Sequence, residues 1–212
     1  MKPSLTSTDL VDKPDWLMFN LEINADLELR LLTEAHTERL HKLIEQNRDH
    51  LRVWLPWVDS TRTLEDTRRF IRFGLRQQAR GSGMNAGIWC DQQLAGVISY
   101  NYIDLGRSQA ELGYWLGADW QGRGIMTAAS QAMTRYAFDR LGLQRVEICC
   151  AVNNLKSRAI PERLGFTLEA IMPQFDWTAE RYVDTAVYSM TAADWHEREI
   201  FDGRENRHRR QF

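Results

Sequence analysis

The chain has 212 residues, of which 43% are hydrophobic and 26% charged, and these values suit one domain with a sizeable core. Its formal net charge of −2 argues against a dedicated DNA or RNA binder, because such proteins usually present a strongly basic surface. The three cysteines form no disulfide framework and no CxxC pair, so we expect a reducing cytoplasm and no metal site. No run approaches about 18 apolar residues and no signal sequence begins the chain, so no membrane segment is expected.

The first half of the chain predicts an N-terminal extension, a strand, two helices and a strand pair. Residues 1–24 contain prolines and polar residues and are assigned to the extension. Residues 27–32 alternate apolar and polar side chains, as a half-buried strand does. Apolar residues recur at helical spacing in 33–51 and 63–80, and 84–104 reads as two strands joined by a turn.

The second half predicts alternating strands and helices before a closing strand pair. Strands are expected at 110–116 and 145–152, with helices at 124–139 and 153–165 between and after them. Two further strands follow, at about 166–174 and 181–190. We therefore expect one domain over 25–195 and a polar C-terminal tail over 196–212.

A glycine turn, "QGRGIM", joins the strand at 110–116 to the next helix. Glycines before a helix let successive backbone N–H groups converge on an anion, and the helix dipole favours negative charge there. The geometry suits a pyrophosphate, and no Lys-Ser/Thr follows as in a Walker A loop. The residues expected to contribute are Gln121, Gly122, Arg123, Gly124, Ile125, Met126 and Thr127. Gln121 and Arg123 would lie at the rim, and Thr127 would hydrogen-bond a phosphate oxygen; the alternative is a tight turn that binds nothing.

This turn and its surroundings resemble the GCN5-related N-acetyltransferases (GNAT). Their acetyl-coenzyme A signature, Q/R-x-x-G-x-G/A, here reads Gln121-x-x-Gly124-x-Met126, with methionine in place of the last small residue. Five segments in order are similar to the RimJ/RimL-type branch, the ribosomal-protein N-acetyltransferases: "LRVWLPWV", "AELGYWLG", "DWQGRGIMT", "NNLKSRAIPERLGF" and "TLEA". The resemblance runs from about residue 27 to residue 190.

The resemblance implies an α/β GNAT fold, a single mixed sheet of about seven strands with flanking helices. The sheet would splay between the strands at 110–116 and 145–152. The pantetheine arm of acetyl-coenzyme A, the implied co-substrate, would lie in this splay and pair with the first strand. Backbone N–H groups at Trp115 and Leu116 would donate to the thioester carbonyl, and Asn154 and Ser157 would open the helix that lines the arm.

Acetyl transfer needs a neutral amine, a stabilised carbonyl oxygen and a leaving thiolate. The resemblance makes the Ser157 hydroxyl a candidate general acid near the sulfur and Asp176 a candidate base facing the acceptor. Each has a structural alternative: Ser157 as a helix-start hydrogen bond, and Asp176 as a turn aspartate, with Asp184 as a second acidic option. Glu111 is a third catalytic candidate, which would hold the substrate ammonium or relay a proton.

Four further residues bear on the site. Trp54 and Trp57 flank a proline in a loop that forms one acceptor wall in this fold, so we expect acceptor contacts there; packing or a subunit contact is the alternative. Cys150 is disfavoured as an acetyl carrier, because no histidine base pairs with it in the sequence. Pro161 removes the helical hydrogen bond to the Ser157 carbonyl, and we expect that distortion to shape the coenzyme end of the helix.

Together these features predict a cytoplasmic N-acetyltransferase that moves an acetyl group from acetyl-coenzyme A to a primary amine. The resemblance implies the N-terminal α-amine of a ribosomal protein as acceptor. A small amine, such as an aminoacyl-nucleotide antibiotic, an aminoglycoside or a polyamine, is the rival acceptor. A non-catalytic acyl-coenzyme A sensor is the rival class, and nucleic-acid binding through "RENRHRR" is disfavoured. The oligomeric state stays open, a homo-oligomer included.

Overall fold

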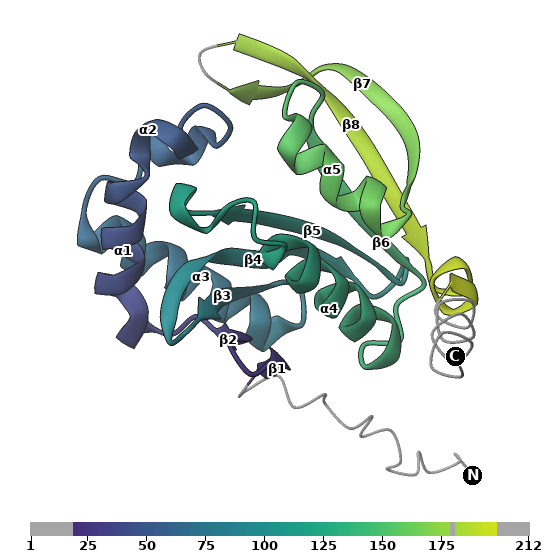
Figure 1. Ribbon diagram of the computed structural model, residues 1–212, viewed down its shortest axis with the longest axis horizontal. Helices are drawn as coiled ribbons and strands as arrows, with labels where there is room; N and C mark the ends of the chain where they lie inside the picture. The colour runs from purple at the N-terminus through teal and green to yellow at the C-terminus, as the bar shows by residue number, and fades with distance from the viewer. Residues whose placement is uncertain (1–18, 179–180, 199–212) are drawn as a thin grey trace, which may run out of the picture.

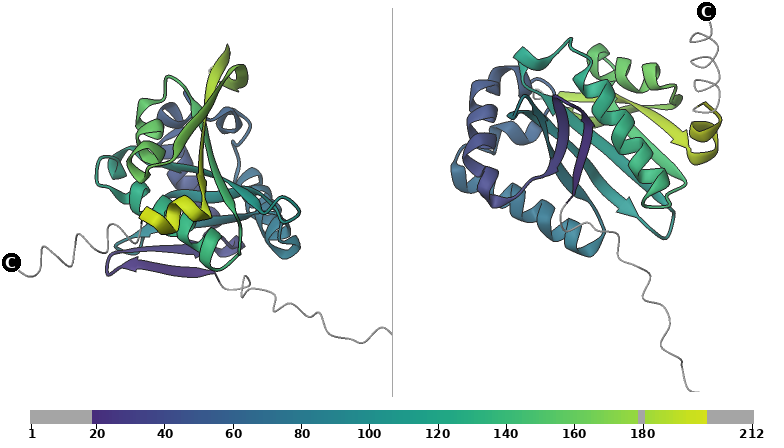
Figure 2. Two further views of the ribbon diagram at one scale, coloured as in Figure 1. Left: turned by 90° about the vertical axis from the view of Figure 1, so that its right-hand side faces the viewer. Right: turned by 60° about the horizontal axis from the view of Figure 1, so that its bottom comes forward.

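The computed structural model describes residues 19–178 and 181–198, which build one eight-stranded mixed sheet with helices on both faces (Figures 1 and 2). The strand order is β1-β2-β3-β4-β5-β6-β8-β7, with β5 and β6 parallel and the other neighbours antiparallel. The strands are β1 (Asn20–Asn24), β2 (Leu27–Leu31), β3 (Met84–Cys90), β4 (Gln93–Asp104), β5 (Gln109–Leu116), β6 (Arg145–Ala151), β7 (Thr167–Thr178) and β8 (Arg181–Thr191). The expected α/β architecture, a single mixed sheet with flanking helices, is confirmed.

The sheet has one strand more than the expected number of about seven, because β1 lies within the residues assigned to an extension. Leu21 pairs with Leu29 of β2, and Leu21 and Ile23 pack against the main core. Their period of two was the available signal for a strand. Residues 1–18 of the predicted extension lie outside the described residues, and so do residues 199–212 of the predicted tail.

The sheet has one hydrophobic core on each face, and helices cover both cores. The helices are α1 (Thr37–Gln46), α2 (Arg48–Leu51), α3 (Leu64–Arg80), α4 (Ile125–Asp139) and α5 (Leu155–Leu164). In β4, Ile98 faces the core that contains α4, whereas Val97 faces the core formed with α1 and α3. No helix in the described ranges is both long and apolar enough to cross a membrane.

The predicted splay lies between β5 and β6. The two strands pair from Gln109↔Arg145 to Leu112↔Ile148, yet β5 continues to Leu116 and β6 to Ala151. β6 stays paired with β8 along this stretch, so these two strands diverge together from β5 (Figure 1). Beyond Leu112, the edge of β5 that faces the gap has no strand partner and offers its backbone groups to a ligand.

Candidate functional site

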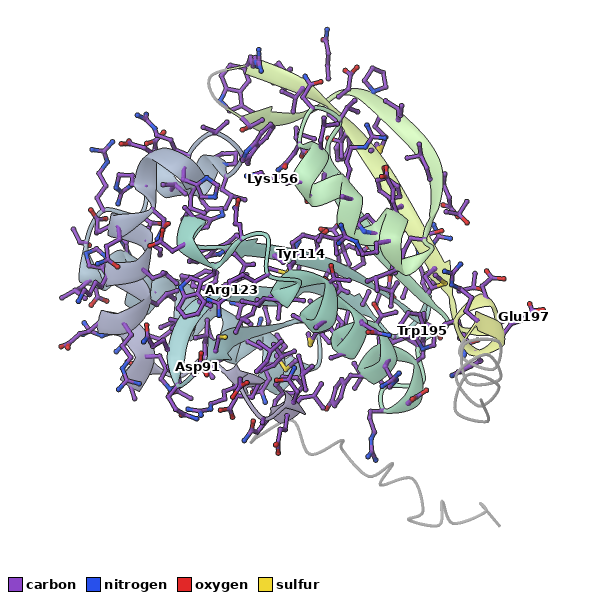
Figure 3. All side chains as sticks on the ribbon, viewed as in Figure 1. Asp91, Tyr114, Arg123, Lys156, Trp195 and Glu197 are labelled. Atoms are coloured by element: carbon purple, nitrogen blue, oxygen red, sulfur yellow. The ribbon has the colours of Figure 1, made fainter. Side chains whose placement is uncertain are left out.

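A cleft of about 1240 Å³ opens where β5 and β6 diverge. Figure 3 shows Tyr114 of β5 and Lys156 of α5 on its two sides. The sequence-predicted residues that line it are Trp54, Glu111, Trp115, Leu116, Gln121, Gly122, Gly124, Ile125, Met126, Thr127, Asn154, Ser157 and Asp176. Two predicted residues, Trp57 and Arg123, lie outside the lining.

The glycine turn requires glycine because of its backbone conformation. Gly122 and Gly124 have φ angles of +73° and +74°, and a Cβ at either position would meet no atom within 4 Å. Space is therefore not the constraint; the left-handed conformation is. Gly124 is the N-cap of α4, so the N–H groups of the first helical turn have no intrahelical partner and point toward the cleft. An anion is favoured at this position.

Gln121 connects two walls of the cleft. Its Oε1 accepts a hydrogen bond from Lys156 Nζ at 2.9 Å, and its Nε2 lies 2.7 Å from His50 Nε2. The side chain that was expected to serve as a free donor at the rim therefore links α2 to α5. A phosphate that enters here would compete with Gln121 Oε1 for the hydrogen bond of Lys156 Nζ.

The positive charge at this end of the cleft comes from α5 and not from Arg123. The Arg123 guanidinium lies 4.9 Å from the ring centroid of Trp120, a cation–π contact, and Arg123 itself does not line the cleft. Arg163 lines the cleft instead, and its Nη1 donates to Thr127 Oγ1 at 2.6 Å. Sequence reasoning missed Lys156 and Arg163. Their spacing of seven residues places both on one helical face, which was a usable signal.

Ser157 lies in the first turn of α5, beside the gap. Its N–H donates to Asn154 Oδ1 at 3.2 Å, so Asn154 supplies the helix-start hydrogen bond that was the alternative role for the Ser157 hydroxyl. Burial raises the pKa of the neighbouring Cys150 thiol to about 11, against a lowering hydrogen bond from Ser157. A thiol that stays protonated at neutral pH is a poor nucleophile.

The opposite end of the cleft is acidic. Asp176 Oδ2 accepts from Thr185 Oγ1 at 2.6 Å, and Glu111 Oε1 accepts from Asn101 Nδ2 at 2.7 Å. Burial raises the pKa of Glu111, and the charges of nearby carboxylates, Asp176 among them, add to the rise. A pocket that disfavours a second negative charge favours a cation such as a substrate ammonium. No cluster of three or more His, Cys, Asp or Glu that could hold a metal was found in the described part of the chain.

A bulge in β7 directs Asp176 into the cleft. The β7–β8 register shifts between Met172 and Asp176, and Gln174 in between has a φ angle of +48°. The Gln174 N–H donates to Asp184 Oδ1 at 2.9 Å. Asp184 therefore has a structural partner in the bulge.

Two distant segments form an aromatic wall of the cleft, where acceptor contacts were predicted. Trp54 lines it from the loop after α2, while Phe175 and Trp177 line it from β7 and are 56% and 50% exposed. Thr178 Oγ1 donates to the Val53 carbonyl at 2.7 Å and ties the two segments together. Sequence reasoning missed Phe175 and Trp177, although both flank Asp176 directly.

Trp57 packs behind this wall and does not line the acceptor wall. Its ring centroid lies 6.1 Å from that of Trp115 and 6.4 Å from that of Phe70, and it packs against the core formed with α1 and α3. The prediction that Trp57 contacts the acceptor thus gives way to its packing alternative. The cause is the short 3-10 helix Pro56–Asp59, which turns successive side chains to different sides.

Comparisons with known proteins agree with this geometry. Residues 26–167 match the family model described as the acetyltransferase (GNAT) domain. The chain is 37% identical over 179 residues to the "Putative ribosomal N-acetyltransferase YdaF" of Bacillus subtilis (strain 168), a match that covers 84% of this chain and 98% of that protein.

Two solved structures are also similar. RimL, a ribosomal L7/L12 alpha-N-protein acetyltransferase in complex with coenzyme A, superposes with a TM-score of 0.79 at 34% identity, covering 84% of this chain and 99% of that one. The microcin C7 self-immunity acetyltransferase MccE, in complex with acetyl-coenzyme A and AMP, gives a TM-score of 0.77 at 30% identity, covering 80% and 94%.

Proposed function

Because the chain belongs to the GNAT acetyltransferase family, we propose that it transfers the acetyl group of acetyl-coenzyme A to the N-terminal α-amine of a protein. One observation carries the proposal: a single cleft joins an anion site, an unpaired strand edge and an acidic, aromatic-walled end. These three features match, in order, a pyrophosphate, a pantetheine arm and an amine. We place the reaction in the cytoplasm.

The donor binds along the first two features. The pyrophosphate accepts from the N–H groups that begin α4, and Lys156 and Arg163 offset its charge. The pantetheine amides pair with the edge of β5 beyond Leu112, where β6 has diverged. The thioester carbonyl then lies near the backbone N–H groups of Trp115 and Leu116, which stabilise the negative charge that develops on oxygen. The RimL neighbour, which binds coenzyme A, supports this placement.

The acceptor amine enters from the acidic end. Asp176, or Glu111 through the same pocket, takes the proton of the ammonium, and the free amine attacks the thioester carbon. A C–N bond forms and the C–S bond breaks, while the Ser157 hydroxyl gives a proton to the departing sulfur. The nitrogen loses its second proton as the amide forms, and this proton restores the Ser157 hydroxyl. An α-amine, with an ordinary pKa of about 7.7–8.0 against about 10.4 for lysine, needs only modest help from such a base.

A ribosomal protein is the acceptor that the relatives favour. YdaF is named a ribosomal N-acetyltransferase, and RimL a ribosomal L7/L12 alpha-N-protein acetyltransferase. The acceptor end of this cleft has half-exposed aromatic side chains at Phe175 and Trp177, so a flexible polypeptide N-terminus can reach Asp176 without passing through a closed tunnel.

An aminoacyl nucleotide is the second candidate acceptor. Trp54, Phe175 and Trp177 offer ring faces on which a base can stack, and the MccE neighbour is in complex with AMP as well as acetyl-coenzyme A. Such a substrate also presents an α-amine, so the same carboxylates would serve it.

The deciding experiment follows release of the coenzyme thiol with acetyl-coenzyme A and a panel of amines. The panel contains ribosomal proteins with free or chemically blocked N-termini, an aminoacyl nucleotide and a polyamine. We expect turnover with free protein N-termini and none with blocked ones, with the added mass of one acetyl group found on the N-terminal peptide. Turnover with small amines alone would reverse the order of acceptors, and tight coenzyme binding without any turnover would favour the sensor.

A further inference from the structure

A hydrogen bond crosses the gap between β5 and α5. Tyr114 Oη donates to the backbone carbonyl of Ser157 at 3.1 Å. Tyr114 lies two residues beyond Leu112, the last residue of β5 that pairs with β6. The tyrosine therefore joins the two walls of the cleft where the sheet no longer does (Figure 3).

The Ser157 carbonyl is free to accept this bond because of Pro161. In a helix, the carbonyl of residue 157 would accept from the N–H of residue 161, but proline has none. Without the Tyr114 hydroxyl, the half-buried Ser157 carbonyl would lose this hydrogen-bond donor. With a residue other than proline at position 161, the carbonyl would already accept a hydrogen bond from the helix backbone. Two residues on different elements thus complement each other at a single oxygen atom.

Tyr114 is suited to act as a constant donor. Burial raises the pKa of its hydroxyl well above the ordinary value, against a lowering hydrogen bond from Ser157. The group keeps its proton at every pH at which the protein is expected to work. The ring packs against the main core, so the position of the hydroxyl is fixed relative to β5.

We propose that Tyr114 is a positioning residue, which sets the distance between β5 and the first turn of α5 by donating to the carbonyl that Pro161 leaves free. The inference rests on the proposed role of Ser157 in acetyl transfer. The carbonyl belongs to Ser157, whose hydroxyl is proposed to protonate the sulfur. The thioester is proposed to bind along β5. A fixed distance between these two elements is therefore a fixed distance between proton donor and sulfur.

Tyr114→Phe removes the hydroxyl and keeps the ring. We expect kcat to fall about tenfold, because a small displacement of an acid–base group is costly, while the KM for acetyl-coenzyme A stays within about twofold. Tyr100→Phe is the matched control. Tyr100 of β4 also donates from a strand to a helix carbonyl, that of Met133 at 2.6 Å, but lies outside the cleft. It should lower thermal stability and leave kcat unchanged.

Pro161→Ala tests the link to the proline. It restores an N–H that competes for the Ser157 carbonyl, so alone it should lower kcat about threefold. In the double variant with Tyr114→Phe no bond crosses the gap, as in Tyr114→Phe alone, so kcat should fall about tenfold and no further than in that single variant. A Tyr114→Phe variant with full kcat, or losses that multiply in the double variant, would overturn the inference.

Two further measurements separate this inference from the proposed function. A full-rate Ser157→Ala variant would contradict the role of Ser157, whereas an impaired Ser157→Ala beside a full-rate Tyr114→Phe would contradict the positioning role alone. The carbonyl ¹³C resonance of Ser157 reports the bond without turnover. It should move upfield in Tyr114→Phe and return in the double variant; an unmoved resonance would show that Tyr114 does not hold this carbonyl.

Discussion

The two ends of the cleft are built in different ways. At the end proposed for the donor, the candidate anion site consists of backbone N–H groups at the start of α4, set by Gly122 and Gly124. At the acceptor end, the wall consists of side chains from the loop after α2 and from β7, which are more than a hundred residues apart and meet through Thr178 and Val53. The donor end is determined locally, whereas the acceptor end depends on the whole fold.

This difference fits the two substrates. Every donor carries the same pyrophosphate, so a rigid backbone site serves all of them. Acceptors differ, and exposed side chains can change without disturbing the core, as loops and edges generally permit. Substitutions at the donor end should therefore affect coenzyme affinity, and those at the acceptor end should affect only the amine.

Asp176→Asn should have the largest effect. Loss of the base should lower kcat/KM for the amine on the order of 10²-fold, with coenzyme affinity unchanged in a direct binding measurement. Asp104→Asn, at an exposed turn, is the control for the same chemical change and should retain activity. If Asp176→Asn kept its rate at every pH, Glu111 would become the leading candidate for the base.

Gly124→Ala should raise the KM for acetyl-coenzyme A about tenfold, because a side chain in the left-handed conformation costs about 1–2 kcal/mol and the turn is expected to relax. Gly142→Ala is the matched control: Gly142 has a φ angle of +64°, its Cβ would also meet open space, and it lies outside the cleft. Both variants should lose similar stability in thermal unfolding. Equal KM values for acetyl-coenzyme A in Gly124→Ala and Gly142→Ala would contradict the proposed coenzyme site at this end of the cleft.

Thr178→Val should act at the acceptor end only. Removing the bond to Val53, worth about 1 kcal/mol, should raise the acceptor KM about fivefold and leave the coenzyme KM unchanged. Thr134→Val removes a comparable threonine-to-carbonyl bond inside α4, at 2.8 Å from Ser130, and should leave both values unchanged. A changed coenzyme KM in Thr178→Val would show that the two ends are coupled.

The smallest effect concerns stability and pH. A carboxyl whose pKa is higher in the folded chain stabilises the fold at low pH, and this contribution is lost as pH rises through the folded value. Glu111 is such a group, so Glu111→Gln should unfold at a slightly higher temperature at pH 7, with the gain vanishing near pH 4.

Glu169 should show the opposite sign in the same measurement. Its hydrogen bonds from Arg145 and Ser189 lower its pKa to about 2, so it stabilises the fold above its ordinary pKa and loses this contribution as pH falls toward 2. Glu169→Gln should therefore be less stable than the parent at pH 7, by a small amount because the carboxyl is partly exposed. Profiles of the same sign in both variants would contradict the contrast.

The same contrast explains what the sequence could predict. The glycine turn and α4 were accessible because glycine placement and apolar periodicity are local signals, whereas the splay was expected only from the family resemblance. The packing of Trp57 was not accessible, since it depends on Phe70 and Trp115, two rings that the fold brings to it. β1 was missed because proline and polar content outweighed a period of two over only five residues.

At the acceptor end, the sequence indicated one of the residues that line the cleft but not the backbone geometry that places it there. Asp176 lines the cleft as expected, but the bulge at Gln174 that directs it there depends on pairing with Asp184 ten residues away. Lys156 and Arg163 were missed because their function emerges only when α5 packs beside the start of α4, where Arg163 meets Thr127.

The bulge has one more consequence, for how the protein behaves at high concentration. β7 is an outer edge of the sheet and is exposed at ten of its twelve positions, including Leu168 and Ile171. Such an edge invites a neighbouring molecule to add a strand and start aggregation. Pro173 lacks the N–H that a new strand would need, and Gln174 bends the edge beside it. The irregularity that turns Asp176 into the cleft thus also makes β7 a poor template for an added strand.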